Sequence, residues 1–166
     1  MLIDILRRLL IGSVFCLVQA VVLSRVRLFD CVTPMLFVYF VIMVPRGYPH
    51  GLTVLWGFLM GLAIDTLSNT PGMASAALTL TAFVQPYLIE LFLPRDAEPD
   101  MKASAEAMGW INFAALTSLL VLLFCAAFFT IEAFSWTNWQ LWLASVTGST
   151  VLTLILIFTC ETFRRK

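Results

Sequence analysis

The sequence predicts an all-α protein, a polytopic membrane helix bundle of six transmembrane helices, and three observations lead to this fold class. Of the 166 residues, 61% are hydrophobic and 12% are charged, whereas soluble domains average roughly 45–50% apolar and about 25% charged residues. The apolar runs recur from one end of the chain to the other, and a helix needs about 20 such residues to cross a bilayer. Polar residues gather in a single loop, residues 94–106. We therefore expect one transmembrane bundle over residues 1–166 and no soluble domain.

The expected spans follow from the apolar runs taken in order. Five of them are delimited by charges, turns or the polar loop, and they cover residues 9–23, 52–67, 73–93, 110–129 and 141–158. The remaining run, residues 35–44, lies between Pro34 and Pro45. At ~1.5 Å per residue it is short for about 30 Å of hydrocarbon, and extending it back to Leu28 includes Asp30. If this segment is re-entrant, five helices cross instead of six.

The distribution of Lys and Arg orients the bundle, because these residues collect on the cytoplasmic side of membrane proteins. With six crossings and a cytoplasmic N-terminus, only Arg25 and Arg27 lie on outer segments. Five crossings with an external N-terminus give the same division. In both cases the polar loop and the C-terminus are cytoplasmic. The residues on the inner segments are Arg7, Arg8, Arg46, Arg95, Lys102, Arg164, Arg165 and Lys166.

The third expected span carries the most informative pattern. Gly57, Gly61 and Asp65 are spaced by four residues, so they lie on one face of the helix. The two glycines form a GxxxG motif, which lets a second helix approach closely. The approaching helix belongs either to the same bundle or to a partner chain, and the motif alone does not distinguish them.

Asp65 needs a partner. A carboxylate in a membrane span costs roughly 2.5–3.5 kcal/mol at the centre and less near an end. Asp65 also lies near the C-terminus of its helix, where the helix dipole disfavours a negative charge. We expect its donor to be Arg25, Arg27 or the free N–H groups that open the next helix, for which Thr70 is the expected N-cap and Pro71 the first residue. A structural clamp and a ligand or proton role both remain open.

Two further stripes of small residues repeat every four positions, one on the first expected span and one on the last. Stripes of this kind allow helices to associate in lipid, where apolar side chains alone provide little attraction between helices. We expect most of them to be used inside the bundle. The stripes are Gly12, Cys16 and Ala20, and Ser145, Ser149 and Thr153.

The chain offers no recognisable catalytic, metal or cofactor site. None of the four cysteines stands in a CxxC or CxxH pair, and one histidine, His50, is too few to build a metal centre. No Ser or Cys stands in a nucleophile motif. The net charge is zero and no long basic run is present, so nucleic acid is not an expected partner. We expect a protein without enzymatic activity that acts by packing against lipid and partner helices.

Residues 33–72 are similar to a known family. In order along the chain, Pro34 opens the second apolar run, Arg46-Gly47 follows it, and Gly51 precedes the run from Gly57 to Asp65 and the pair Pro71-Gly72. These residues resemble the rod shape-determining protein MreD family, whose signature is a proline opening the second helix, an Arg-Gly loop, and a G-F-x-x-G-L-x-x-D run followed by P-x-G or P-L-G. The chain departs from that pattern at Met35, where an acid is common, and in having Pro71 and Gly72 adjacent.

The resemblance implies a non-enzymatic scaffold subunit of the cell-elongation complex in the bacterial cytoplasmic membrane. It implies binding to MreC, a single-span protein, and indirect links to MreB filaments, RodA and penicillin-binding protein 2. The alternative function is the substrate-binding membrane subunit of a small-molecule, vitamin-type transporter. In that case the stripe Gly12, Cys16 and Ala20 is the coupling face, and a polar pocket opens outward.

Overall fold

The computed structural model describes residues 34–45, 47–70, 72–92, 108–133 and 139–164, and within them the regular secondary structure is helical. Four of these helices are long and apolar enough to cross a membrane. The chain is therefore a multi-pass membrane protein with an all-α fold, as expected. The expected span over residues 9–23 lies outside the described residues. The helices are α2 (Val38–Ile42), α3 (His50–Ser68), α4 (Met73–Phe92), α6 (Trp110–Glu132) and α7 (Trp139–Arg164).

Three of the four long helices, α3, α6 and α7, extend beyond the apolar runs that predicted them, whereas α4 keeps to its run. The largest extension is in α7, which was expected to end at residue 158 and continues to Arg164. A helix satisfies its own backbone hydrogen bonds, so it can continue into the interface, where polar side chains are solvated. The end of α3 is sharper, because Asn69 adopts a left-handed conformation with φ 56°.

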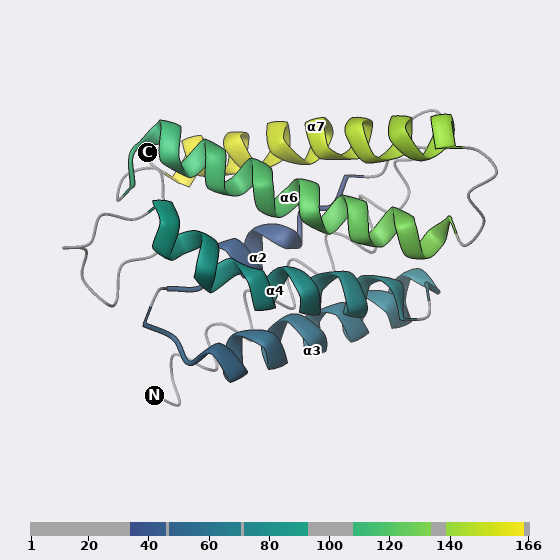
Figure 1. The fold of residues 1–166 in the computed structure, drawn as a ribbon, viewed down its shortest axis with the longest axis horizontal. Coiled ribbons are helices and arrows are strands. Elements are labelled where there is room, and N and C mark those ends of the chain that lie inside the picture. Colours follow the sequence, from purple (N-terminus) through teal and green to yellow (C-terminus); the bar gives the residue numbers. More distant parts are fainter. Residues whose placement is uncertain (1–33, 46, 71, 93–107, 134–138, 165–166) are drawn as a thin grey trace.

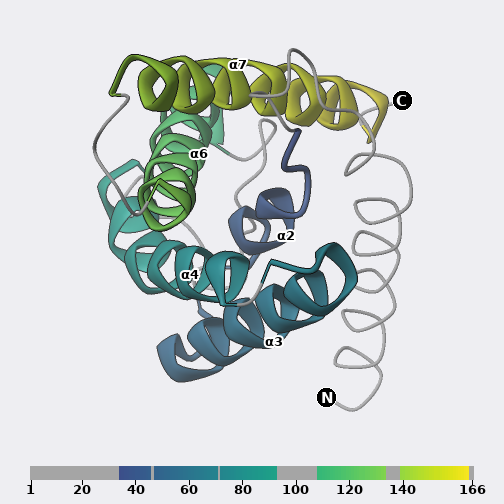
Figure 2. The ribbon, with the colours of Figure 1, turned by 90° about the vertical axis from the view of Figure 1, so that its right-hand side faces the viewer.

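The long helices form an arc of two antiparallel hairpins around α2. The α3–α4 hairpin packs against the α6–α7 hairpin through the contact between α4 and α6. Figure 1 shows the helices side by side, and Figure 2 shows α7, α6, α4 and α3 following one another around the short central helix. The principal contacts of α2 are with α4 and α6.

The α2 helix has five residues, so it rises about 7.5 Å and cannot cross the bilayer by itself. A crossing helix over residues 35–44 was the first expectation. The residues on either side of α2 form turns and irregular backbone instead, as the re-entrant alternative requires. Irregular backbone at membrane depth is tolerated where it is enclosed in protein. Here every residue of α2 is buried.

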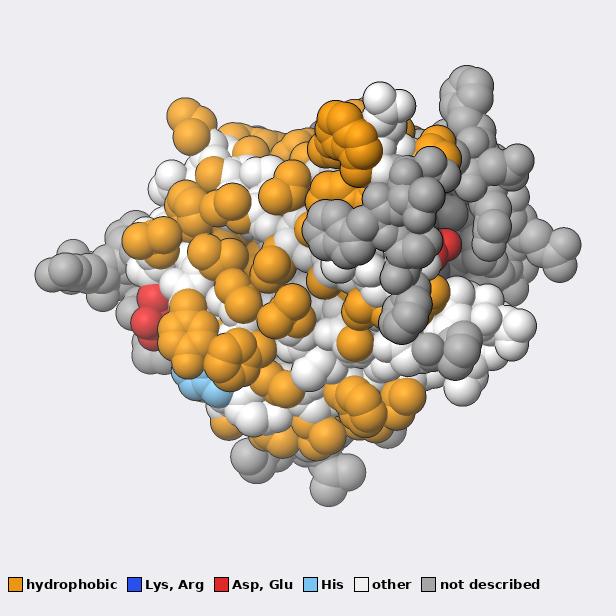
Figure 3. Space-filling model, turned by 45° about the vertical axis from the view of Figure 1, so that its right-hand side comes forward, with side chains coloured by type: hydrophobic (Ala, Val, Ile, Leu, Met, Phe, Trp, Pro, Cys, Tyr) orange, Lys and Arg blue, Asp and Glu red, His pale blue; other side chains and the backbone are white. Residues whose placement is uncertain are grey.

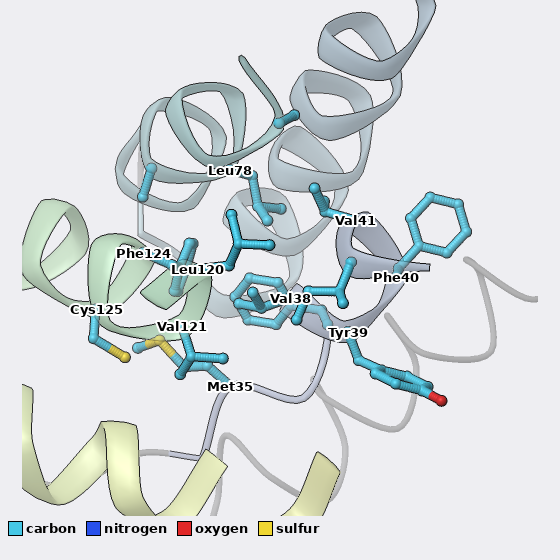
Figure 4. Close-up of a cluster of buried hydrophobic side chains, with 14 of the residues drawn as sticks. Met35, Val38, Tyr39, Phe40, Val41, Leu78, Leu120, Val121, Phe124 and Cys125 are labelled. Carbon is cyan, nitrogen blue, oxygen red and sulfur yellow. The ribbon is translucent and has the colours of Figure 1, made fainter. Parts of the chain in front are cut away.

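The apolar core is centred on α2. Val38, Leu78, Leu120 and Phe124 are all fully buried, and they come from α2, α4 and α6 (Figure 4). The ring of Phe37, just before α2, meets the ring of Phe124 edge to face with centroids 5.2 Å apart. Such aromatic pairs contribute about 0.5–1.5 kcal/mol beyond the burial of their area. The centre of the described bundle is thus filled by side chains of the chain itself.

The antiparallel hairpins, combined with the cytoplasmic side expected from the Lys and Arg distribution, give a topological prediction for two glutamates at opposite ends of the bundle. Glu90, near the end of α4, and Glu132, at the end of α6, are both exposed. We expect Glu132→Cys to react with a membrane-impermeant maleimide in intact cells, and Glu90→Cys to react only after permeabilisation, in a background without the four native cysteines. Equal reaction of both variants in intact cells would contradict the antiparallel arrangement in the membrane.

Candidate functional site

The two glycines of α3 lie directly against α4. A Cβ atom added to Gly57 would lie 2.8 Å from the Cβ of Ala82 and 3.1 Å from the carbonyl oxygen of Leu78. A Cβ added to Gly61 would lie 2.7 Å from the amide nitrogen of Ser75, in contact with backbone that cannot easily move. Of the two possibilities that the motif left open, the structure places this face inside the bundle. We call the contact between Gly57, Gly61 and α4 the glycine seam.

Asp65 lies at the end of the glycine seam and binds the first turn of α4. Its Oδ1 accepts a hydrogen bond from the backbone N–H of Ala74, and its Oδ2 accepts one from the N–H of Ser75, both at 2.9 Å. The hydroxyl of Thr70 also donates to Oδ1, at 3.0 Å. The side chain is 5% exposed. Asp65 therefore caps the following helix from the helix before it.

This position also accounts for the charge of Asp65. The C-terminal end of α3 disfavours a carboxylate, but the N-terminal end of α4, where the side chain binds, favours one. Hydrogen bonds to an ionised acceptor are roughly twice as strong as neutral ones. The backbone carbonyl of Asp65 contributes as well, because it accepts hydrogen bonds from the amides of Asn69 and Thr70. One residue thus holds both sides of the α3–α4 turn.

The expected N-cap at Thr70 is wrong. The α4 helix begins at Met73, and the Thr70 hydroxyl binds the Asp65 carboxylate instead of an amide of α4. Gly72 precedes the helix with φ 84°, a backbone conformation that residues with a side chain rarely adopt. The cap comes from a residue nine positions earlier than Ala74. Capping rules that examine only adjacent residues assign the cap to Thr70, whereas the expectation that the opening N–H groups of the next helix donate to Asp65 is confirmed.

The remaining residues of the family-like stretch have varied environments. Pro34 is buried ahead of α2, and Gly47 lies in an exposed turn. A Cβ on Gly51 would meet no atom within 4 Å, so no close approach requires glycine there. The other expected residues lie outside the described ranges, so the structure does not bear on them. These are Gly12, Cys16, Ala20, Arg25, Arg27, Arg46 and Pro71.

A second buried carboxylate, Glu161 in α7, was not singled out from the sequence. It is 5% exposed and accepts a hydrogen bond from the hydroxyl of Tyr39 in α2. Another hydroxyl of α7, that of Thr153 about two turns earlier, accepts a hydrogen bond from the backbone N–H of Met35 at 3.1 Å. Thr153 was expected in a stripe for helix association, whereas it satisfies irregular backbone beside α2. An acid close to the C-terminus of an apolar helix is the sequence signal for Glu161, as it is for Asp65.

Asp65 and Glu161 do not form a joint site. Each lies near the C-terminal end of its helix, and α3 and α7 run in opposite directions (Figure 1). The two side chains therefore lie toward opposite ends of the bundle. Within the described ranges, no group of three or more His, Cys, Asp and Glu side chains could hold a metal ion. Both carboxylates bind donors of their own chain. The arrangement is suited to fixing helices in place.

Comparison with known proteins adds no further assignment. The sequence matches no family model, no curated protein and no solved structure.

The glycine seam predicts an order of stability among three alanine substitutions. We expect Gly61→Ala to destabilise the fold by about 3 kcal/mol or more, because its Cβ would collide with the α4 backbone. Gly57→Ala should cost less, about 1–2 kcal/mol, because its Cβ would press on the Cβ of Ala82 and the carbonyl oxygen of Leu78 at longer distances than the contacts at Gly61. Gly51→Ala is the control and should change stability by less than about 1 kcal/mol. Denaturant unfolding in detergent measures all three, and equal losses at Gly51 and Gly61 would refute close packing at the seam.

Asp65 predicts a loss of stability through orphaned amides. Asp65→Ala leaves two buried N–H groups without an acceptor, so we expect a loss of about 2–5 kcal/mol. Asp65→Asn retains one acceptor oxygen and should lose less. The matched control, Glu90→Gln on the exposed face of α4, should stay within about 0.5 kcal/mol of the parent. An Asp65→Ala variant as stable as the control would show that the hydrogen bonds of Asp65 do not stabilise the α3–α4 turn.

Proposed function

We propose that this multi-pass membrane protein is a non-enzymatic scaffold subunit of the bacterial cell-elongation complex, similar in role to the MreD family. In this proposal the chain binds a single-span, MreC-like protein through its transmembrane helices. It contributes in this way to the link between MreB filaments and the peptidoglycan polymerase pair of RodA and penicillin-binding protein 2. The proposal starts from the resemblance of residues 33–72, and two features of the structure support it.

The observation that carries the proposal is the structural use of the family-like residues. Gly57 and Gly61 stand where a side chain would strike α4, and Asp65 binds the amides that open α4. Gly72 supplies the positive φ before that helix. Four signature positions therefore build one hairpin, and each residue type has a physical reason.

The second feature is the filled interior, which favours a scaffold over a transporter subunit. Ligand sites are concave and place a few polar groups toward an open volume. Here the side chains of α2 occupy the centre of the described bundle, against Leu78, Leu120 and Phe124 (Figure 4). Two buried polar side chains beside it, Gln85 and Thr153, bind the backbone next to α2, and a third, that of Glu161, binds Tyr39.

The glycine seam is occupied within the chain, so the proposed partner must contact an outward face. Hydrophobic side chains cover the face seen in Figure 3 over the long helices. Every long helix has a large apolar side chain that is exposed and can report on its surroundings. These are Phe58 in α3, Phe83 in α4, Leu122 in α6 and Ile155 in α7.

The test is site-specific crosslinking combined with co-purification. A photoreactive amino acid replaces Phe58, Phe83, Leu122 or Ile155, one at a time, in cells that also produce an MreC-like protein. We expect the two proteins to co-elute in detergent, and one helix or two neighbouring helices to crosslink to the partner. A photoreactive residue in place of the buried Phe124 is the control and should give no crosslink to the partner.

Two outcomes would contradict the scaffold. The first is the absence of both co-elution and crosslinking while the protein remains folded. The second is a rise in melting temperature with a vitamin-like ligand, since a ligand that binds only the native state stabilises it. The second outcome would favour the transporter alternative.

A further inference from the structure

Hydrogen bonds from the short helix α2 and from the residues beside it connect it to both hairpins. On one side, the side-chain amide of Gln85 in α4 donates to the carbonyl oxygen of Val44 at 3.1 Å. On the other side, the N–H of Met35 donates to Thr153 of α7, and the hydroxyl of Tyr39 donates to Glu161 of α7. The principal direct contact between the hairpins is that of α4 with α6. The residues around α2 therefore tie α4 to α7 across the inner side of the arc.

The position of α2 depends on these ties and on apolar packing. A helix of five residues has little stability of its own, because helix nucleation is unfavourable and few bonds follow it. Pro34 and Pro45 lie at either side of it and interrupt regular backbone. The element is thus held by its surroundings and is not continuous with a neighbouring long helix in the described residues.

The bond between Tyr39 and Glu161 differs from the other ties because it involves a buried carboxylate. Glu161 lies close to the C-terminal end of α7, where the helix dipole opposes its charge. A buried ionic group contributes little net stability, and its best-attested use is to select one arrangement among several. Apolar packing holds α2 in the core, whereas this bond specifies where α2 lies relative to α7.

We propose that α2 is a latch between the α3–α4 and α6–α7 hairpins, and that the Tyr39–Glu161 hydrogen bond is its release point. When this bond breaks, α2 moves away from α7 and stays with α4, which is its principal neighbour. The hairpins then separate on the inner side of the arc while α4 and α6 remain in contact. This device is independent of the proposed function, because it follows from contacts within the chain.

A native cysteine reports on the latch. Cys125 of α6 is 0% exposed and belongs to the same buried cluster as Met35 and Val38 (Figure 4). Movement of α2 would uncover its thiol. The experiment follows the reaction of the purified full-length protein with N-ethylmaleimide under native conditions, and mass spectrometry measures the adduct at Cys125. Cys160, which is partly exposed in α7, is the internal reference for reagent access.

Two substitutions alter the release bond with little change of shape: Tyr39→Phe removes its donor, whereas Glu161→Gln keeps an acceptor oxygen and removes the charge. We expect Tyr39→Phe to raise the rate of reaction at Cys125 by about tenfold or more, as a lost hydrogen bond to a charged group implies, and Glu161→Gln to raise it by a smaller factor. The rate at Cys160 should stay within about twofold of the parent. The matched controls, Tyr87→Phe and Glu90→Gln, change the same residue types at exposed positions of α4 and should leave Cys125 unreactive.

Comparison with Asp65→Asn separates release of the latch from general destabilisation. This variant weakens the α3–α4 turn and does not touch α2, so it should lower the melting temperature without a matching rise at Cys125. The latch is refuted if Tyr39→Phe does not raise the Cys125 rate, if Glu161→Gln raises it more than Tyr39→Phe does, or if Asp65→Asn raises it as much as Tyr39→Phe does. If Glu161→Gln fails to fold, Tyr39→Phe alone decides, because it keeps the buried ring.

Discussion

The hydrogen bonds between the Asp65 carboxylate and the amides that open α4 determine how the first described hairpin is built. They turn an unfavourable charge at the end of one helix into the cap of the next. They also fix the distance between the two helices, because both ends of the interaction are short and rigid. At that distance only glycine fits at position 61, where a Cβ would lie 2.7 Å from the Ser75 amide nitrogen. The glycine seam and the carboxylate are therefore parts of one solution to close packing in lipid.

The interior of the described bundle uses polar groups in a different way. Around α2 the chain leaves regular helix at a depth where unsatisfied backbone groups are costly. Side chains from α4 and α7 supply the missing partners, as Gln85 and Thr153 do. These side chains, which lie in apolar helices, thus serve as hydrogen-bond partners of the backbone. This arrangement allows irregular structure to lie among the buried side chains of Leu78, Leu120 and Phe124.

Much of the architecture could be predicted from the sequence, and the exceptions have physical causes. Long apolar runs predicted α3, α4, α6 and α7, since each run is close to the length of a crossing helix. The spacing of Gly57, Gly61 and Asp65 predicted a shared face. The cap of α4 was assigned to Thr70 because capping rules consider neighbours along the chain. Glu161 was missed because its partner, Tyr39, is 122 residues away and no local pattern joins them.

The separation of these contacts along the chain has a consequence for biosynthesis. The bonds of Asp65 reach at most ten residues ahead, so they can form as soon as the start of α4 has left the ribosome. The hydrogen-bond partners that Met35 and Tyr39 have in α7 lie 118 and 122 residues further on, so they are translated after α3, α4 and α6. Until α7 is inserted, the short central helix lacks the hydrogen bonds that Thr153 and Glu161 provide. Premature termination before α7 would leave an intact first hairpin beside an unanchored segment, a form that membrane quality-control proteases are suited to recognise.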